Sequence, residues 1–95
     1  MELFTIRRRN QWATAEDLEA TAAKSTAEGE KMSDEVRWIR SYVLEEDDGT
    51  LGTLCVYEGV DEEAIRRHAS NAEMSADEVV KVADTVIVRE DPIKA

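Results

Sequence analysis

The cysteine and the histidine of this sequence, one of each, are the side chains best suited to chemistry. Cys55 lies in the apolar run Leu54–Tyr57, and His68 lies in an amphipathic segment further along the chain. A thiolate and an imidazole are ligands for borderline-soft ions such as nickel, which makes both residues candidate metal ligands. Two side chains do not close a site, so carboxylates or a second copy would have to complete it. The alternatives are a small buried hydrophobe at Cys55 and a half-buried histidine bonded to the backbone.

A second candidate site combines an arginine with aromatic rings. Trp38, Arg40 and Tyr42 alternate along one predicted strand, which places them on one face, and Tyr57 follows on the next strand. An aromatic-lined cleft containing a guanidinium can hold a small anionic ligand through a carboxylate or phosphate group. The alternative is that Arg40 pairs with an acidic residue across the dimer and stacks on Trp38.

Further chemical motifs are absent from the sequence. It contains no Gly-rich phosphate loop and no Gly-x-Ser-x-Gly elbow, and a Cys–His catalytic pair forms only if folding brings the two residues together. The acidic run 45–49 lacks the alternating oxygen spacing of a calcium loop. Whether the protein is an enzyme therefore stays open, with no catalytic residue assigned.

Composition and net charge limit the classes of partner that the protein is expected to bind. The net charge is −10, from 12 basic and 22 acidic residues, which disfavours nucleic acid and anionic membrane surfaces. The lone cysteine excludes an internal disulfide. No signal peptide or long apolar run is present, which predicts a cytoplasmic location. A length of 95 residues predicts a single domain over 1–95.

Periodicity and capping signals predict six elements. Thr14-Ala15-Glu16-Asp17 has the form of a capping box, and Asp61 is a good N-cap for a second helix. The second helix has its apolar stripe at Ala64, Ile65, His68, Ala69 and Ala72. Strands are predicted at 2–8, 36–43, 52–57 and 78–88, helices at 14–32 and 61–72, a hairpin turn at 45–49, and a frayed tail at 89–95.

This order predicts an α+β fold of the ferredoxin-like type, βαββαβ. In that fold a four-stranded antiparallel sheet carries both helices on one face. The 36–43 strand has apolar side chains on both faces, a pattern typical of a central strand covered twice. One cover is the pair of helices. The second is predicted to be another copy of the chain, which gives a homodimer packed sheet to sheet.

Three stretches resemble a known family: Trp38–Val43, Cys55–Glu58 and Asp61–Ala69. The chain is similar there to the small actinobacterial nickel-responsive, nickel-binding proteins, most of which are classed as a domain of unknown function. The runs Trp-x-x-Ser-Tyr-Val and Cys-Val-Tyr are the most specific parts of the resemblance. It implies a ferredoxin-like fold, a sheet-to-sheet homodimer and a nickel-associated, non-enzymatic function, with Cys55 and His68 as candidate ligands.

Two departures from the family pattern bear on that function. Glu73-Met74-Ser75 stands where members often have Gly-Phe-Pro, and Arg40 stands at a strand position where some relatives carry a histidine. A guanidinium has no lone pair for a metal ion, so a ligand at that position would be lost. Two other functions stay open: a small-molecule-binding or catalytic dimer using the Arg40 cleft, and a plain dimeric interaction module.

Overall fold

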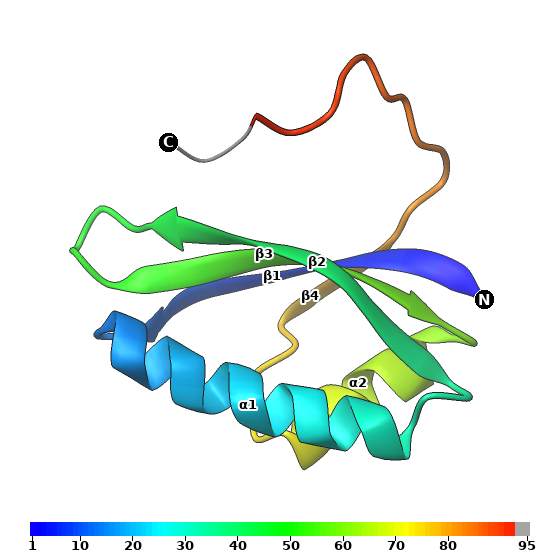
Figure 1. The fold of residues 1–95 in the computed structure, drawn as a ribbon, viewed down its shortest axis with the longest axis horizontal. Helices are drawn as coiled ribbons and strands as arrows, with labels where there is room; N and C mark the ends of the chain where they lie inside the picture. The colour runs from blue at the N-terminus through cyan, green and yellow to red at the C-terminus, as the bar shows by residue number, and fades with distance from the viewer. Residues whose placement is uncertain (93–95) are drawn as a thin grey trace.

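A computed structural model describes residues 1–92 of the protein. The elements follow one another as strand, helix, strand, strand, helix, strand, which confirms the predicted order (Figure 1). They are β1 (Glu2–Trp12), α1 (Ala15–Lys31), β2 (Val36–Glu45), β3 (Leu51–Gly59), α2 (Glu62–Asn71) and β4 (Glu78–Lys81).

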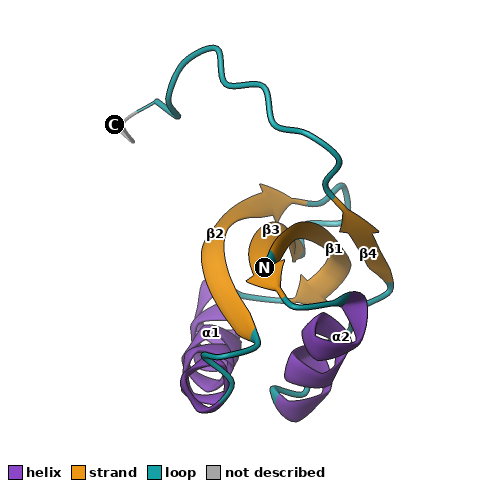
Figure 2. Ribbon diagram, turned by 90° about the vertical axis from the view of Figure 1, so that its right-hand side faces the viewer, coloured by secondary structure: helices purple, strands orange, loops and turns teal. Residues whose placement is uncertain are grey.

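The four strands form one antiparallel sheet in the order β2-β3-β1-β4. Both helices pack against the same side of this sheet, which we call the helix face, and the other side we call the open face (Figures 1 and 2). This arrangement confirms the predicted ferredoxin-like α+β fold.

Both helices begin where the capping signals predict. The Thr14 hydroxyl accepts a hydrogen bond from the Asp17 N–H at 3.2 Å, and the Asp61 carboxylate accepts one from the Ala64 N–H at 2.8 Å. Each bond satisfies a backbone donor that the first helical turn leaves free. Within residues 1–92 the structure contains no helix with the length and hydropathy needed to cross a bilayer.

The core lies between the helix face and the two helices. All five positions of the predicted α2 stripe, including His68, are buried. They meet alternate residues of the two central strands, because β1 and β3 each turn every second side chain toward the helices. The core cluster contains Phe4, Ile6, Met32, Val36, Cys55, Tyr57, Ala64 and Ile65.

The prediction that the 36–43 strand is central is wrong, because β2 forms one edge of the sheet. The pairing of β2 with β3 also contains a one-residue bulge. Trp38 pairs with Tyr57 and Arg40 with Val56, so Ile39 is an extra residue. Beyond the bulge the alternation is reversed: Ser41 lies opposite Cys55 on the helix face, and Tyr42 lies opposite Leu54 on the open face.

The last strand is shorter than the predicted 78–88, since β4 ends at Lys81. The Val82 N–H donates to the Leu3 carbonyl at 2.9 Å, and β1 begins at Glu2, so the neighbouring strand offers almost no further partner. The chain then leaves the sheet and crosses above the open face toward β2 (Figures 1 and 2). The predicted fraying of 89–95 concerns a stretch whose last residues, 93–95, lie outside the described ones.

Candidate functional site

The bulge in β2 separates the four residues of the predicted arginine–aromatic cleft. The Trp38 ring stacks on Tyr57 on the helix face, with ring centroids 6.1 Å apart and planes 4° from parallel. Arg40 and Tyr42 lie beyond the bulge on the open face. The structure therefore brings the residues together as two pairs on opposite sides of the sheet.

Arg40 makes a surface ion pair. Its Nη1 donates to the Asp91 carboxylate at 3.1 Å and to the Tyr42 hydroxyl at 3.3 Å, and the Tyr42 hydroxyl donates to the same carboxylate at 2.7 Å. All three side chains are exposed. The neighbouring tyrosine and carboxylate raise the pKa of Arg40 above its usual range. Arg40 thus pairs with an acidic residue of its own chain, in the tail, and does not stack on Trp38, which lies on Tyr57.

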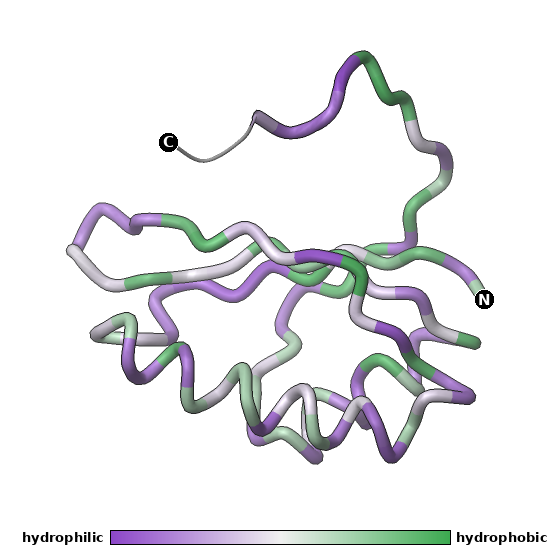
Figure 3. The backbone as a smooth tube through the Cα atoms, viewed as in Figure 1, coloured by the Kyte–Doolittle hydropathy of each residue, from purple (hydrophilic) through white to green (hydrophobic). Residues whose placement is uncertain are grey.

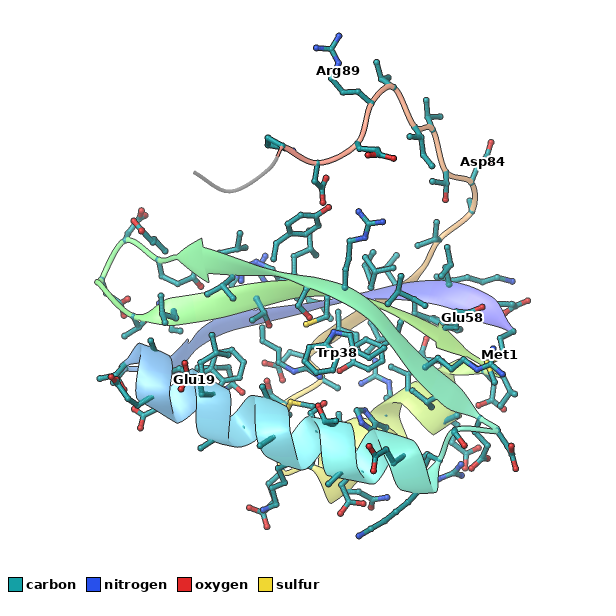
Figure 4. The ribbon with its side chains drawn as sticks, in the orientation of Figure 1. Met1, Glu19, Trp38, Glu58, Asp84 and Arg89 are labelled. Carbon is teal, nitrogen blue, oxygen red and sulfur yellow. The ribbon has the colours of Figure 1, made fainter. Side chains whose placement is uncertain are left out.

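A pocket of about 430 Å³ lies between the helix face and α1. Figure 4 shows Trp38 between the sheet and this helix. Five residues of β2 line the pocket, namely Trp38, Ile39, Arg40, Ser41 and Val43. Trp38, Ile39 and Val43 are 42%, 46% and 52% exposed, so the pocket opens to solvent between the edge strand and α1. Its inner wall is formed by Arg8, Trp12, Ser25, Thr53, Cys55 and Tyr57.

Arg8 is the charged side chain at the inner end of this pocket, and it is only 1% exposed. Its Nε donates to the Ser75 carbonyl at 2.6 Å and its Nη1 to the Cys55 sulfur at 3.5 Å, whereas Nη2 has no hydrogen-bond partner. No carboxylate among residues 1–92 pairs with it. A buried cation without a counter-charge is costly, by about 3–5 kcal/mol in cases where a partner has been removed.

Cys55 lies next to Arg8 on the helix face. Its sulfur accepts a hydrogen bond from the Ser41 hydroxyl at 3.0 Å as well as the contact from Arg8. The Trp38 indole donates to the same hydroxyl at 2.7 Å, so Ser41 connects the aromatic wall to the thiol. The cysteine is buried, as the hydrophobe interpretation expects, and it is also polar-bonded.

His68 is buried and contacts a different set of residues. Its Nε2 lies 3.0 Å from the Ser25 carbonyl, and its ring packs against Tyr57 with centroids 5.4 Å apart. A carbonyl oxygen only accepts, so Nε2 carries the proton and donates it. This is the histidine bonded to a backbone group that the sequence offers as an alternative to a ligand.

Other groups compete with a metal ion for the Cys55 sulfur and for Nε2 of His68 in this arrangement. The position beside the sulfur is taken by the Arg8 guanidinium, which would repel a cation, and the Nε2 lone pair of His68 is occupied by a proton. Over residues 1–92, no group of three or more histidine, cysteine or carboxylate side chains is arranged to hold a metal. The assignment of these two residues as ligands stays a prediction.

Tyr57 joins the pocket to the core. Its hydroxyl lies 3.2 Å from the Ser25 hydroxyl, and burial raises the pKa of the Tyr57 phenol, with the Ser25 hydrogen bond opposing the rise only in part. The phenol is therefore neutral at ordinary pH and can serve the pocket only as a hydrogen-bonding group.

The sequence interpretation missed Arg8, the most unusual residue of the site. An arginine within the basic run 7–9 is expected to be solvated rather than buried. The alternation of β1 contains the signal, because Phe4 and Ile6 point to the helix face and Arg8 is the next residue in that series.

Together, the sheet topology and the pocket define a small ferredoxin-like α+β protein with a ligand-sized space between sheet and helix. Residues 4–82 match the family model described as nickel responsive protein SCO4226-like. The chain belongs to this family. The resemblance found in the sequence is therefore confirmed, at the level of family membership.

One solved structure resembles the chain closely in fold. It is the crystal structure of SCO4226 from Streptomyces coelicolor A3(2), which has 21% sequence identity and a TM-score of 0.69. The match covers 88% of this chain and 99% of that one. At this identity the likeness supports the fold. No curated protein gives a significant sequence match.

Proposed function

We propose that this protein acts as a homodimer in a nickel response. Membership of a family described as nickel responsive supports the cellular role. The open face is the observation that supports the dimer. The two helices cover the helix face, but no helix or strand of residues 1–92 covers the open face (Figure 2).

The open face is apolar enough to need a cover. Leu54 and Val56 of β3 alternate with the buried residues of that strand and are only partly buried, and Val80 of β4 is 59% exposed. Tyr42 adds an aromatic ring from β2. A second copy that packs through the same face, as in an isologous dimer, would bury all of these side chains at once.

The tail supplies further surface for the same contact. Val86, Ile87 and Val88 are 85%, 77% and 82% exposed, and Figure 3 shows this hydrophobic stretch of the tail held away from the sheet. Three β-branched residues in sequence favour a strand, yet within one copy β1 offers no residues to pair with them. A second copy would provide both a pairing edge and an apolar surface.

The dimer is tested by changing the tail. The triple variant Val86→Ser, Ile87→Ser, Val88→Ser is expected to weaken self-association by roughly 100-fold, because three buried aliphatic side chains would be lost on each copy. Sedimentation velocity over a concentration series measures this, with circular dichroism to verify folding. Val60→Ser, at an exposed valine of the β3–α2 connection, is the matched control. A wild-type protein that stays a monomer at all concentrations would overturn the proposal.

Nickel binding is tested separately by equilibrium dialysis with metal analysis. We expect the wild-type protein to take up Ni²⁺ saturably and Cys55→Ala to change the affinity by less than about twofold, since the sulfur faces a cation. If the protein takes up no Ni²⁺ saturably, direct nickel binding is ruled out, and the alternative of a plain interaction module is favoured. A large loss of affinity in Cys55→Ala would show instead that Arg8 moves aside to admit the metal.

The alternative of a small-molecule site built on Arg40 gains no support, because Arg40 is bound to Asp91 on the open face. The pocket on the helix face is lined by three charged residues, Arg8, Glu19 and Arg40, but the Arg40 guanidinium is bonded to Asp91.

A further inference from the structure

We propose that the pocket between the helix face and α1 binds a small organic monoanion, with its carboxylate held by Arg8 and Thr53. This inference does not depend on nickel or on the dimer. It starts from two residues that line the pocket, Arg8 and Thr53, because each has a buried polar atom, Nη2 and Oγ1 respectively, without a hydrogen-bond partner among residues 1–92.

The two unpartnered atoms belong to neighbouring residues. Arg8 of β1 and Thr53 of β3 are directly paired across the sheet, and both side chains point to the helix face. The Cβ atoms of such a pair are about 4.5–5.5 Å apart, so one carboxylate can meet both side chains. A guanidinium N–H and a hydroxyl are both donors to a carboxylate, which makes the pair a matched anion site.

The arginines on either side of Arg8 both pair with a carboxylate. Arg7 pairs with Glu46 at 2.8 Å and Arg9 with Glu78 at 2.7 Å. In a chain with 22 acidic residues, an arginine is easily given a protein partner. Arg8, the one of the three that faces the pocket, has none, and a ligand carboxylate would supply the missing charge.

The Cys55 sulfur does not satisfy every hydrogen-bond donor of the Arg8 guanidinium. The sulfur contacts Nη1 and already accepts the Ser41 hydroxyl, so Nη2 of Arg8 is left without a partner among residues 1–92. The cysteine instead fixes one edge of the guanidinium, and the Ser75 carbonyl fixes Nε. The remaining donor is therefore held in place before a ligand arrives, which lowers the entropy lost on binding.

The rest of the pocket indicates what the anion is attached to. Trp12, Trp38 and Tyr57 supply aromatic walls, and a space of about 430 Å³ lies within the range of small-molecule sites. Glu19 of α1 also lines the pocket and would repel a second negative charge. These features favour a monocarboxylate with an aromatic or branched apolar body over an inorganic anion or a dianion.

The protein carries its own reporter for this site. Both tryptophans of the sequence, Trp12 and Trp38, line the pocket, so intrinsic fluorescence responds to its occupation. We would titrate the full-length wild-type protein with phenylacetate and with phenylacetamide, its uncharged counterpart, in buffer containing EDTA. The expected result is saturable quenching by phenylacetate, and binding of phenylacetamide at least about tenfold weaker, because the amide cannot neutralise Arg8.

Two variants complete the test. Arg8→Met keeps the length of the side chain without its charge and is expected to weaken phenylacetate binding at least about tenfold while leaving the melting temperature equal or higher. Arg9→Met, at the exposed arginine paired with Glu78, should bind as the wild type does. Thr53→Val, which removes the second donor at nearly constant volume, provides an independent check if Arg8→Met fails to fold.

Three results would overturn the proposal. They are equal affinity for the acid and the amide, unchanged phenylacetate binding in Arg8→Met, and no saturable signal with either probe. The last result would mean that Nη2 of Arg8 does not bind a carboxylate ligand.

Discussion

Gly52→Ala is expected to lower the free energy of unfolding by about 2 kcal/mol, the typical effect of forcing an extra methyl group into a packed site. A Cβ atom on Gly52 would lie 2.5 Å from the Arg8 carbonyl oxygen and 2.7 Å from both Arg7 Nη1 and Glu46 Oε2. The first of these atoms is backbone and cannot turn away. The other two belong to the Arg7–Glu46 ion pair that crosses this glycine.

Gly29→Ala is the matched control for this substitution. A Cβ there would be 3.6 Å from His68 Nε2, an ordinary contact, and Gly29 lies inside α1. Alanine in a helix interior is more stable than glycine by about 0.5–1 kcal/mol, so this variant should be stabilised. Urea unfolding followed by circular dichroism measures both. Equal, small changes in the two variants would contradict the close approach of β1 and β3 at Gly52.

The order of elements could be predicted from the sequence because local signals mark it. Thr14 and Asp61 cap the helices, the apolar stripe of α2 is buried as predicted, and the acidic turn joins β2 to β3. Each of these features depends on residues close in sequence. The predicted topology then followed from the order alone.

The position and register of β2 could not be predicted in the same way. Its apolar residues on both faces are typical of a central strand, but here one set faces α1 and the other belongs to the open face of an edge strand. The bulge at Ile39 depends on how β2 meets β3, a tertiary property that alternation within β2 does not show. It moved Arg40 and Tyr42 away from Trp38.

Pairing partners also explain the error in the last strand. The valine-rich run to Val88 favours a strand, but a strand needs a neighbour, and β1 begins at Glu2. Site prediction failed at Arg8 for a related reason. An arginine in a basic run is normally solvated, and its burial appears only when Phe4, Ile6 and Arg8 are read as one face covered by helices.

Tyr57→Phe is expected to have a destabilising effect that becomes smaller at high pH. At pH 7 the variant loses the hydrogen bond to Ser25 and leaves that buried hydroxyl without a partner, which should lower the free energy of unfolding by about 1 kcal/mol. The wild-type protein pays no ionisation cost there, because the phenol is neutral in both the folded and the unfolded state.

Above about pH 10 the balance shifts. The unfolded chain then loses the Tyr57 proton near the ordinary value of 10.0, whereas burial raises the pKa of the folded phenol and keeps it protonated. The unfolded state binds fewer protons, so wild-type stability falls as pH rises, by up to about 1.4 kcal/mol per pH unit until the folded pKa is reached. Phenylalanine has no proton to lose, and the variant lacks this decline.

The difference between wild type and Tyr57→Phe should therefore shrink as the pH rises above 10. Urea unfolding at pH 7, 9, 10 and 11 measures it, and comparing two proteins at each pH cancels the titration of groups that they share. A constant difference for Tyr57→Phe across the series would mean that this phenol ionises as easily in the folded protein as in the unfolded one, and hence that the stack of Trp38, Tyr57 and His68 admits water.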